Sequence, residues 1–261
     1  MPSYVVVGAS RGLGLEFVKQ LLAKGNVVIA LARKPASSEG LVAIQDKNLH
    51  VVQADIVDSE SLKKAASETA QITGGSLDVL INNAAYVSYS FHTIADPPSE
   101  SALLDDLNKG WNTNVLGPIL TTNAFLPLLR KGSLKKILTL SSGLGDPALV
   151  LESGFAGQVG YCVSKAAVEM VNVQYANALK HEGFTFLAIS PGVVKTAQTA
   201  PPAEFLPYIQ KQGEQFASVY PHWKGPIEPP ESVGSMLGVF DNTTVADSGK
   251  FVSHLGNRNW L

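Results

Sequence analysis

The sequence predicts a doubly wound α/β fold, in which about seven parallel strands form a sheet with helices on both faces. Short apolar runs recur along the 261 residues and none alternates cleanly, which is typical of strands that are buried on both faces. The segments between the runs have helical spacing, so right-handed crossovers would place the strands in one parallel sheet. The strands are predicted at 4–8, 27–32, 49–55, 77–82, 136–141, 185–190 and 250–255.

The first predicted helices have recognisable faces and ends. Leu13, Phe17 and Leu21 recur every fourth residue and would share a buried face, and Gly25 is suited to end that helix. A second helix is expected over 58–72, where the first two residues, an aspartate and a serine, are both candidates for the N-cap. Strand and helix therefore alternate along this part of the chain.

Residues 197–231 interrupt the alternation. They are rich in proline and aromatic side chains and contain no strand-like run. We expect one catalytic domain, 1–261, in which this insertion covers the sheet as a substrate lid. The alternative is an aromatic cluster that simply attaches an irregular segment to the body.

Composition and charge favour a cytoplasmic protein and argue against several partners. With 20 basic and 22 acidic side chains intermixed, the chain has no cationic stripe for nucleic acid. One cysteine and five histidines without ligand spacing predict neither a disulfide nor a metal site. No leader precedes the first apolar run, and no apolar segment approaches the roughly 18 residues of a membrane helix, so we expect no membrane association.

A glycine-rich turn, GASRGLG at 8–14, follows the first predicted strand and leads into the first helix. Gly8, Gly12 and Gly14 would permit positive φ and a close approach of the backbone to a pyrophosphate at the helix N-terminus. The same pattern also suits a tight turn without a ligand. The turn therefore indicates a nucleotide site that other residues must support.

Cations stand where an NAD site usually has an acid. That acid follows the second strand and bonds the ribose 2′-hydroxyl, whereas this chain has Arg33 and Lys34 there and Arg11 inside the glycine turn. Guanidinium groups pair with a 2′-phosphate through charge-assisted hydrogen bonds, so the pattern favours NADP(H) over NAD(H). The alternative is that these residues are solvated surface cations.

Two tyrosines precede a lysine by four residues, Tyr161 before Lys165 and Tyr220 before Lys224. The first pair follows a strand and begins an apolar helical run, where side chains four residues apart lie side by side. The second pair lies in the proline-rich insertion, where Tyr220 precedes a proline and no helix would hold the two groups together. The first pair is therefore the candidate for chemistry.

Six motifs in this order resemble those of the short-chain dehydrogenase/reductase family, over residues 3 to about 255. They are GASRGLG (8–14), NNAA (82–85), NVLGP (114–118), LSS (140–142), YCVSK (161–165) and SPGVVKT (190–196). The glycine spacing is similar to that of the small single-domain branch, and SGKF with the terminal NRNWL is most similar to sniffer-type carbonyl reductases. The resemblance implies a Rossmann-type sheet and a nicotinamide coenzyme.

The resemblance also implies a catalytic set of Asn114, Ser142, Tyr161 and Lys165. A free tyrosine has a pKa of about 10, and a neighbouring ammonium with an oxidised nicotinamide would favour the phenolate, so Tyr161 could exchange a proton near neutral pH. Ser142 would hydrogen-bond the substrate oxygen, with Ser141 as the alternative. Asn114 would hold a water that connects the lysine to solvent. As alternatives, Ser142 is a strand-end cap and Asn114 a locally bonded helix residue.

A set of coenzyme contacts follows from the same resemblance. Asp55, with Ile56 beside it, would border the adenine, and Asn82 would stabilise the fourth strand beside the ribose. The Val194 backbone and the Thr196 hydroxyl would anchor the carboxamide, which leaves one ring face for the substrate. The full set is Gly8, Ser10, Arg11, Gly12, Leu13, Gly14, Arg33, Asp55, Ile56, Asn82, Tyr161, Lys165, Val194 and Thr196.

The chain departs from the family pattern near these contacts. Val7 stands where threonine is common, and Ala85 replaces the last glycine of the NNAG motif. The serine and tyrosine motifs are 19 positions apart, longer than usual, which predicts an inserted loop at 143–160 bordering the substrate. Cys162 follows the tyrosine but would point about 100° away along a helix, so we expect it to pack and not to act in redox chemistry.

Together these features predict an NADPH-dependent reductase that converts a hydrophobic ketone or aldehyde to an alcohol. The candidate pocket walls are the 143–160 loop, the segment after the fourth strand, and lid residues Phe205, Tyr208, Phe216, Tyr220 and Trp223. The alternative is an NADP(H)-binding regulatory or redox-sensing protein with little turnover, which the intact catalytic set argues against. A homodimer, common in the family, would pair helices from 100–130 and 160–182.

Overall fold

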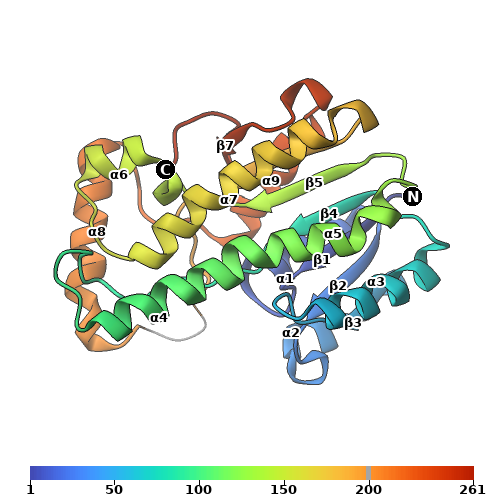
Figure 1. The fold of residues 1–261 in the computed structure, drawn as a ribbon, viewed down its shortest axis with the longest axis horizontal. Coiled ribbons are helices and arrows are strands. Elements are labelled where there is room, and N and C mark those ends of the chain that lie inside the picture. The colour runs from blue at the N-terminus through green and yellow to red at the C-terminus, as the bar shows by residue number, and fades with distance from the viewer. Residues whose placement is uncertain (198–200) are drawn as a thin grey trace.

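A seven-stranded parallel sheet forms the centre of the molecule (Figure 1). The computed structural model describes residues 1–197 and 201–261. The strand order is β3-β2-β1-β4-β5-β6-β7 and every ladder is parallel, so the predicted fold class is confirmed. The strands are β1 (Ser3–Val7), β2 (Val27–Ala32), β3 (Leu49–Gln53), β4 (Val79–Asn82), β5 (Lys136–Leu140), β6 (Thr185–Ser190) and β7 (Phe251–Ser253).

Helices cover both faces of the sheet (Figure 1). Helices α1, α2 and α9 pack on one face, and α3, α5 and α7 pack on the other. The helices are α1 (Gly12–Ala23), α2 (Glu39–Val42), α3 (Ser59–Thr73), α4 (Glu100–Gly110), α5 (Gly117–Leu129), α6 (Pro147–Ser153), α7 (Val159–Ala178), α8 (Leu206–Val219) and α9 (Pro229–Asp241). Within the two described ranges, no helix has both the length and the apolar character that a membrane crossing requires.

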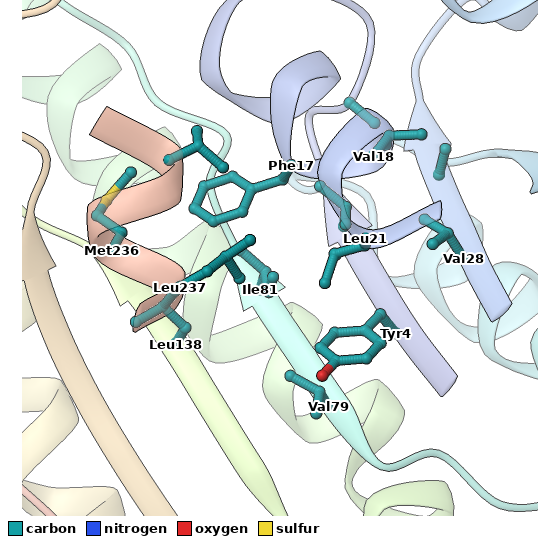
Figure 2. Packing of buried hydrophobic residues seen from close by; sticks show 14 of the residues in the cluster. Tyr4, Phe17, Val18, Leu21, Val28, Val79, Ile81, Leu138, Met236 and Leu237 are labelled. Carbon is teal, nitrogen blue, oxygen red and sulfur yellow. The ribbon is translucent and has the colours of Figure 1, made fainter. Parts of the chain in front are cut away.

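Alternate residues of each central strand enter two separate cores. In β1, Tyr4 and Val6 face α1 and α9, whereas Val5 and Val7 face α3 and α5. Figure 2 shows the first core, where the ring of Phe17 lies between α1 and the side chains of α9. Because both faces of these strands are buried, their sequences are unbroken apolar runs, and this is why the strands could be predicted.

The predicted helix ends rest on identifiable hydrogen bonds. Helix α3 has Asp58 as its N-cap, whose carboxylate accepts the N–H groups of Glu60 and Ser61 at 2.9 and 3.2 Å. Of the two N-cap candidates, the structure therefore selects the aspartate. After α1, Gly25 has φ of +78° and its N–H donates to the Leu22 carbonyl at 2.8 Å, as expected for a glycine that ends a helix.

Helices α4 and α5 form one continuous rod through a π-helical segment, η2 (Trp111–Leu116) (Figure 1). A π-helical turn holds an extra residue and is often found at functional sites. This segment contains Asn114, which is almost fully buried. The sequence carries no pattern that separates a π-helical turn from an α-helical one, so this feature was not predicted.

The predicted lid, 197–231, is largely helical in its described part. It contains η5 (Ala203–Phe205) and α8, while its residues 198–200 lie outside the described residues. Helix α8 packs against α6, and Ile227 forms an isolated parallel bridge with Val194. The insertion is thus attached both to the segment that follows β5 and to the one that follows β6. The organisation of the whole chain as one domain stays a prediction.

Candidate active site

Tyr161 and Lys165 lie one turn apart near the start of α7, beside the end of β5. The Lys165 ammonium is 5.6 Å from the centroid of the Tyr161 ring and donates to the Leu140 carbonyl at 2.7 Å. Helix α7 begins against α4, where the Gly160 N–H donates to Asp106 Oδ2 at 2.9 Å and a Cβ on the glycine would lie 2.5 Å from the Asp106 carbonyl. This close contact positions the tyrosine that follows.

Burial changes the acidity of both members of the pair. It raises the pKa of Tyr161 to about 12, although a hydrogen bond with Ser142 opposes this shift. Burial also lowers the pKa of Lys165 to about 8, and the nearby carboxylate of Glu169 opposes that change. In this structure the phenol therefore keeps its proton at neutral pH, which is the form that can donate one.

The two serines after β5 face different groups. Ser142 lies close enough to the Tyr161 phenol to lower its pKa, and the Ser142 Oγ accepts the Leu144 N–H at 3.2 Å. Ser141 is buried, and its hydroxyl donates to Glu169 Oε1 at 3.1 Å. The structure thus brings Ser142 to the tyrosine, while the hydroxyl of the alternative serine is bonded elsewhere.

Asn114 connects α7 with the segment that follows β4. Its Oδ1 accepts the Tyr86 N–H at 2.7 Å, and its Nδ2 donates to the Tyr86 carbonyl at 2.8 Å and to Ser164 Oγ at 2.9 Å. The Ser164 hydroxyl donates in turn to the Tyr161 carbonyl at 2.8 Å. The asparagine side chain therefore braces the helix that carries the tyrosine, a role that the sequence did not predict for it.

The glycine turn after β1 has a backbone that only glycine fits. Gly8 has φ of +72°, and a Cβ there would lie 2.8 Å from the Cα of Ala84, while a Cβ on Gly14 would collide with the Gly8 carbonyl oxygen. The first N–H groups of α1 have no carbonyl partner within the helix. A turn whose glycines carry no side chains, at a helix N-terminus with free N–H groups, fits the pyrophosphate of a dinucleotide.

The adjacent asparagines Asn82 and Asn83 have different roles at this turn. Asn83 Nδ2 donates to the Val7 and Gly8 carbonyls, both at 3.0 Å, and so holds the glycine turn against β4. Asn82 Nδ2 donates to Thr122 Oγ1 at 3.2 Å, while its buried Oδ1 has no partner among the described residues. The predicted contact was Asn82, and the bonds of Asn83 to the turn were missed, although both residues lie in the NNAA motif.

Other predicted coenzyme residues also lie around the turn. The N–H groups of Gly8 and of the next residue donate to the Leu31 carbonyl, which places the turn beside Arg33 at the end of β2. Arg11 and Arg33 are both exposed, and neither forms a salt bridge with a described residue. Thr196 is far away in sequence but adjacent in space, since a Cβ on Gly12 would lie 3.4 Å from its Cβ.

At the end of β3, Asp55 and Ile56 make local contacts. The Asp55 carboxylate accepts the Val57 N–H at 3.2 Å. Ile56 packs on α5, where a Cβ on Gly117 would lie 2.7 Å from its Cδ1. Both residues therefore lie on the side of the sheet where the glycine turn opens, one strand beyond Arg33.

An apolar cluster packs against Tyr161. Leu144, Phe155 and Phe216 form its buried part, with ring centroids of the two phenylalanines 6.2 Å apart. The partly buried residues packed against it are Val150, Tyr161, Cys162, Val193, Trp223 and Leu261. The predicted 143–160 loop supplies much of this wall, but part of it is helix α6 and not a loop.

Aromatic residues of the lid also contact the segment after β4. Phe91 stacks on Tyr208 with ring centroids 5.1 Å apart, and Tyr89 stacks on Phe205 at 6.1 Å. Both interpretations of the lid, a pocket wall and an aromatic attachment, are compatible with these contacts. These contacts attach the lid to the segment that follows β4.

In the part of the chain that the structure describes, Tyr220 and Cys162 form hydrogen bonds with backbone groups and not with groups that could take part in proton transfer or redox chemistry. The Tyr220 hydroxyl accepts the Trp260 N–H at 3.3 Å, and within the described chain no hydrogen bond or cation–π contact joins it to Lys224. Burial raises the pKa of the Cys162 thiol to about 12, and its Sγ donates to the Gly157 carbonyl at 3.7 Å. A thiol of this kind packs and is a poor nucleophile.

Sequence reasoning missed three polar or aromatic residues beside the site: Asp146, Glu169 and Trp260. Glu169 is largely buried, and burial raises its pKa to about 7, although the bond from Ser141 opposes the shift. Its position four residues after the lysine was a usable signal, because such residues share a helix face. Asp146 and Trp260 meet through a long-range bond that no local pattern announces.

Comparisons with known proteins agree with this geometry. Residues 3–205 match the family model described as short chain dehydrogenase. The chain is 42% identical, over the full length of both proteins, to the short-chain dehydrogenase/reductase AacuF of Aspergillus aculeatus. It is 30% identical to the NADPH-bound carbonyl reductase from chicken fatty liver, with a TM-score of 0.80 and 98% of each chain covered. With the putative carbonyl reductase Sniffer of Caenorhabditis elegans it shares 25% identity and a TM-score of 0.75, also over 98% of each chain.

Proposed function

The chain belongs to the short-chain dehydrogenase family, whose members are oxidoreductases that bind a nicotinamide coenzyme, and from that premise we propose that it uses NADPH to reduce the carbonyl group of a hydrophobic small molecule. One observation carries the proposal. The Tyr161 phenol, the Ser142 hydroxyl beside it and the Lys165 ammonium lie together next to an apolar cluster. An acid, a second hydroxyl donor and a cation are what carbonyl reduction requires besides hydride.

The coenzyme would bind across the carboxyl ends of the central strands. When bound, NADPH supplies the hydride. The glycine turn would hold the pyrophosphate, while Arg11 and Arg33 would pair with the 2′-phosphate because no acid is present to bond a free 2′-hydroxyl. The remaining coenzyme contacts would be Ser10, Leu13, Asp55, Ile56, Asn82, Lys165, Val194 and Thr196. The NADPH bound to the chicken carbonyl reductase supports the choice of NADP(H).

Tyr161 would act as the proton donor. Because its pKa is raised to about 12 in the coenzyme-free chain, the phenol arrives protonated, and it would transfer its proton as the carbonyl oxygen becomes an alkoxide. Ser142 would donate a hydrogen bond to the same oxygen and stabilise its growing charge. The Lys165 ammonium, close to the ring, would stabilise the phenolate that remains.

The Lys165 ammonium has more N–H donors than the one that bonds the Leu140 carbonyl. A lysine ammonium carries three N–H donors, and one bonds the Leu140 carbonyl at 2.7 Å. The others would bond the ribose of the coenzyme. Asn114 braces the helix that holds both groups and would also hold the water that resupplies the proton.

The substrate would be an apolar ketone or aldehyde. The walls beside Tyr161 are formed by Leu144, Phe155 and Phe216 with further apolar neighbours, and among these side chains none is charged. Such a pocket favours an aromatic or alicyclic compound over a charged one, because a buried charge without a partner is costly.

The test is NADPH oxidation, followed at 340 nm, with a panel of aromatic, alicyclic and charged carbonyl compounds. We expect turnover with the apolar members and little with the charged ones. Tight NADPH binding without turnover of any member would contradict the proposal and favour a redox-sensing protein instead.

We place this activity in the cytoplasm and propose that the protein works as a homodimer. The surface formed by α4, η2 and α7 exposes Trp111 and Val163 around a groove that Leu107 and Gly160 also line. Exposed apolar groups of this kind favour association. Sedimentation equilibrium of the wild type and of Trp111→Glu would test it: we expect a dimer that the charged variant weakens, and a monomeric wild type would contradict it.

A further inference from the structure

The last four residues of the chain lie against the substrate side of the site. Trp260 is 3% exposed, and its ring stacks on Phe251 with centroids 4.3 Å apart. The Arg258 guanidinium lies 5.3 Å from the centroid of the same ring. The chain end is therefore a packed part of the molecule.

Asp146 anchors this segment. Its Oδ2 accepts the Trp260 Nε1–H at 3.0 Å and the Arg258 Nη2–H at 2.8 Å, while its Oδ1 accepts the Ala148 N–H at the start of α6. The carboxylate is almost completely buried, with 8% of the side chain exposed. A buried carboxylate with all these donors is well satisfied, so it holds α6 and the chain end in one fixed arrangement.

Residues 258–261 contact both the turn that follows Ser142, called the serine turn below, and the lid. A Cβ on Gly143, the residue after Ser142, would lie 2.7 Å from the Trp260 Cβ. Trp260 therefore packs directly on the serine turn. On the lid side, the Trp260 N–H donates to the Tyr220 hydroxyl at 3.3 Å. Trp260 therefore lies between the serine turn and the lid.

Leu261 packs on the apolar cluster beside Tyr161. This is the cluster of Leu144, Phe155 and Phe216 that Tyr161 also contacts. The catalytic tyrosine and the last leucine thus share apolar neighbours, although 100 positions separate them in the sequence.

We propose that Arg258–Leu261 is a wall of the substrate site, in which Asp146 and Trp260 are positioning residues for Ser142 and Leu261 limits the size of the substrate. This inference rests on the proposed carbonyl reduction and adds a specificity element to it. Among the described residues the segment contacts the serine turn and the lid and not the glycine turn, so we expect coenzyme binding at that turn to be independent of it.

The first experiment tests substrate size with Leu261→Ala. From the panel, one monocyclic and one fused bicyclic ketone that the wild type reduces are compared by kcat/KM. The shorter side chain enlarges the pocket, so the ratio of bicyclic to monocyclic kcat/KM should rise about tenfold. The matched control is Leu255→Ala, an exposed leucine six positions earlier, which should leave the ratio unchanged.

The second experiment tests positioning with Trp260→Phe, which keeps an aromatic ring but removes the Nε1–H donor to Asp146. We expect kcat to fall about tenfold for both ketones while the dissociation constant of NADPH stays close to that of the wild type. Loss of the buried donor should also lower the unfolding temperature by a few degrees. Arg258→Ala should give a smaller fall in kcat. Its control is Arg130→Ala, another exposed arginine paired with a carboxylate but remote from the site, which should not alter kcat.

The outcomes separate this inference from the proposed function. A wild type that reduces no carbonyl compound overturns both. A wild type that does reduce them, with an unchanged size ratio in Leu261→Ala and an unchanged kcat in Trp260→Phe, overturns the role of the chain end alone. A changed ratio with unchanged NADPH affinity supports it.

Discussion

The proposed coenzyme side and the proposed substrate side of this site are formed by different kinds of contact. On the coenzyme side, Gly8 and Gly14 shape a turn inside one strand-turn-helix unit, and Asn83 holds its backbone from the neighbouring strand. On the substrate side, Asp146 bonds Trp260 across 114 positions, and Tyr220 of the lid accepts the Trp260 backbone N–H. One side is mainly backbone geometry, and the other is mainly long-range contact between side chains.

This difference predicts how the two sides respond to substitution. A backbone turn with positive φ and no room for Cβ tolerates only glycine, so its changes should appear as lost coenzyme binding. A surface of side chains is adjustable, so its changes should appear in rate and in substrate choice. The four predictions below separate these effects, beginning with the largest.

Tyr161→Phe should show the largest effect and confine it to the rate. The variant loses the proton donor but keeps the ring, so we expect kcat to fall by about 10³-fold or more with the dissociation constant of NADPH nearly unchanged. Stopped-flow NADPH oxidation and a fluorescence titration measure the two quantities. The control is Tyr220→Phe, which should retain most of the activity; a wild-type rate in the Tyr161 variant would sink the assignment.

Gly8→Ala should instead lower the affinity for NADPH. The new methyl group would meet Ala84 and the residue would be strained at φ of +72°, so NADPH affinity should fall about 100-fold. Gly25→Ala is the matched control because Gly25 has a similar φ of +78° but nothing within 4 Å of its Cβ position. Calorimetric titration compares the two variants. Equal loss of affinity in both would mean that backbone strain, and not the shape of the turn, explains the effect.

Arg33→Ala sharpens the description of the coenzyme side. Loss of one guanidinium partner should weaken NADPH about tenfold and NADH very little, since only NADPH carries the 2′-phosphate. The ratio of the two dissociation constants is the measurement. Lys19→Ala, which removes an exposed cation from α1, should leave the ratio unchanged. If Arg33→Ala weakens both coenzymes equally, the 2′-phosphate assignment is wrong.

Glu169→Gln should show the smallest effect, on stability and not on coenzyme binding. Burial raises the pKa of Glu169 from 4.5 to about 7, so the folded protein holds a proton that the unfolded chain has released. The stability that this proton provides is present below pH 4.5 and is lost as the pH rises through about 7. Glutamine keeps the acceptor for Ser141 without the buried charge, next to Lys165, Asp146 and Arg258.

Thermal unfolding of the coenzyme-free proteins at pH 5 and pH 8 measures this effect. Relative to the wild type, the glutamine variant should gain about 1 kcal/mol at pH 8, after allowance for screening by solvent, and less at pH 5. That is a rise of roughly 2–4 °C in Tm. Glu68→Gln, an exposed glutamate on α3, should give the same difference at both pH values. A pH-independent gain at Glu169 would contradict its raised pKa.

Much of the fold and the geometry of the glycine turn could be predicted because the physical causes are local. Strands buried on both faces are unbroken apolar runs, and each of the seven predicted strands is present with ends that differ by at most two residues. Glycine in the turn and tyrosine four positions before lysine are constraints between close neighbours along the chain. These patterns were sufficient to select Tyr161 over Tyr220 as the candidate for chemistry.

The substrate side could not be predicted in the same way. The π-helical turn around Asn114, the different partners of Ser141 and Ser142, and the bond of Asp146 to Trp260 all depend on which elements pack together. A single aspartate or tryptophan in the sequence carries no information about a partner more than a hundred positions away, because many arrangements would satisfy its hydrogen bonds. The inserted segment 143–160 was predicted as a loop and contains helix α6 for the same reason.

Local stereochemistry and hydrophobic periodicity were therefore enough to identify the parallel sheet, the coenzyme turn and the tyrosine and lysine pair. Tertiary packing decided which serine lies beside the tyrosine, which carboxyl group is buried and how the last four residues pack against the serine turn and the lid. The physical reason is the sequence separation over which each kind of constraint acts. Backbone constraints act over a few residues and leave a motif, whereas side chains that meet only after folding are selected by shape and hydrogen bonding in three dimensions.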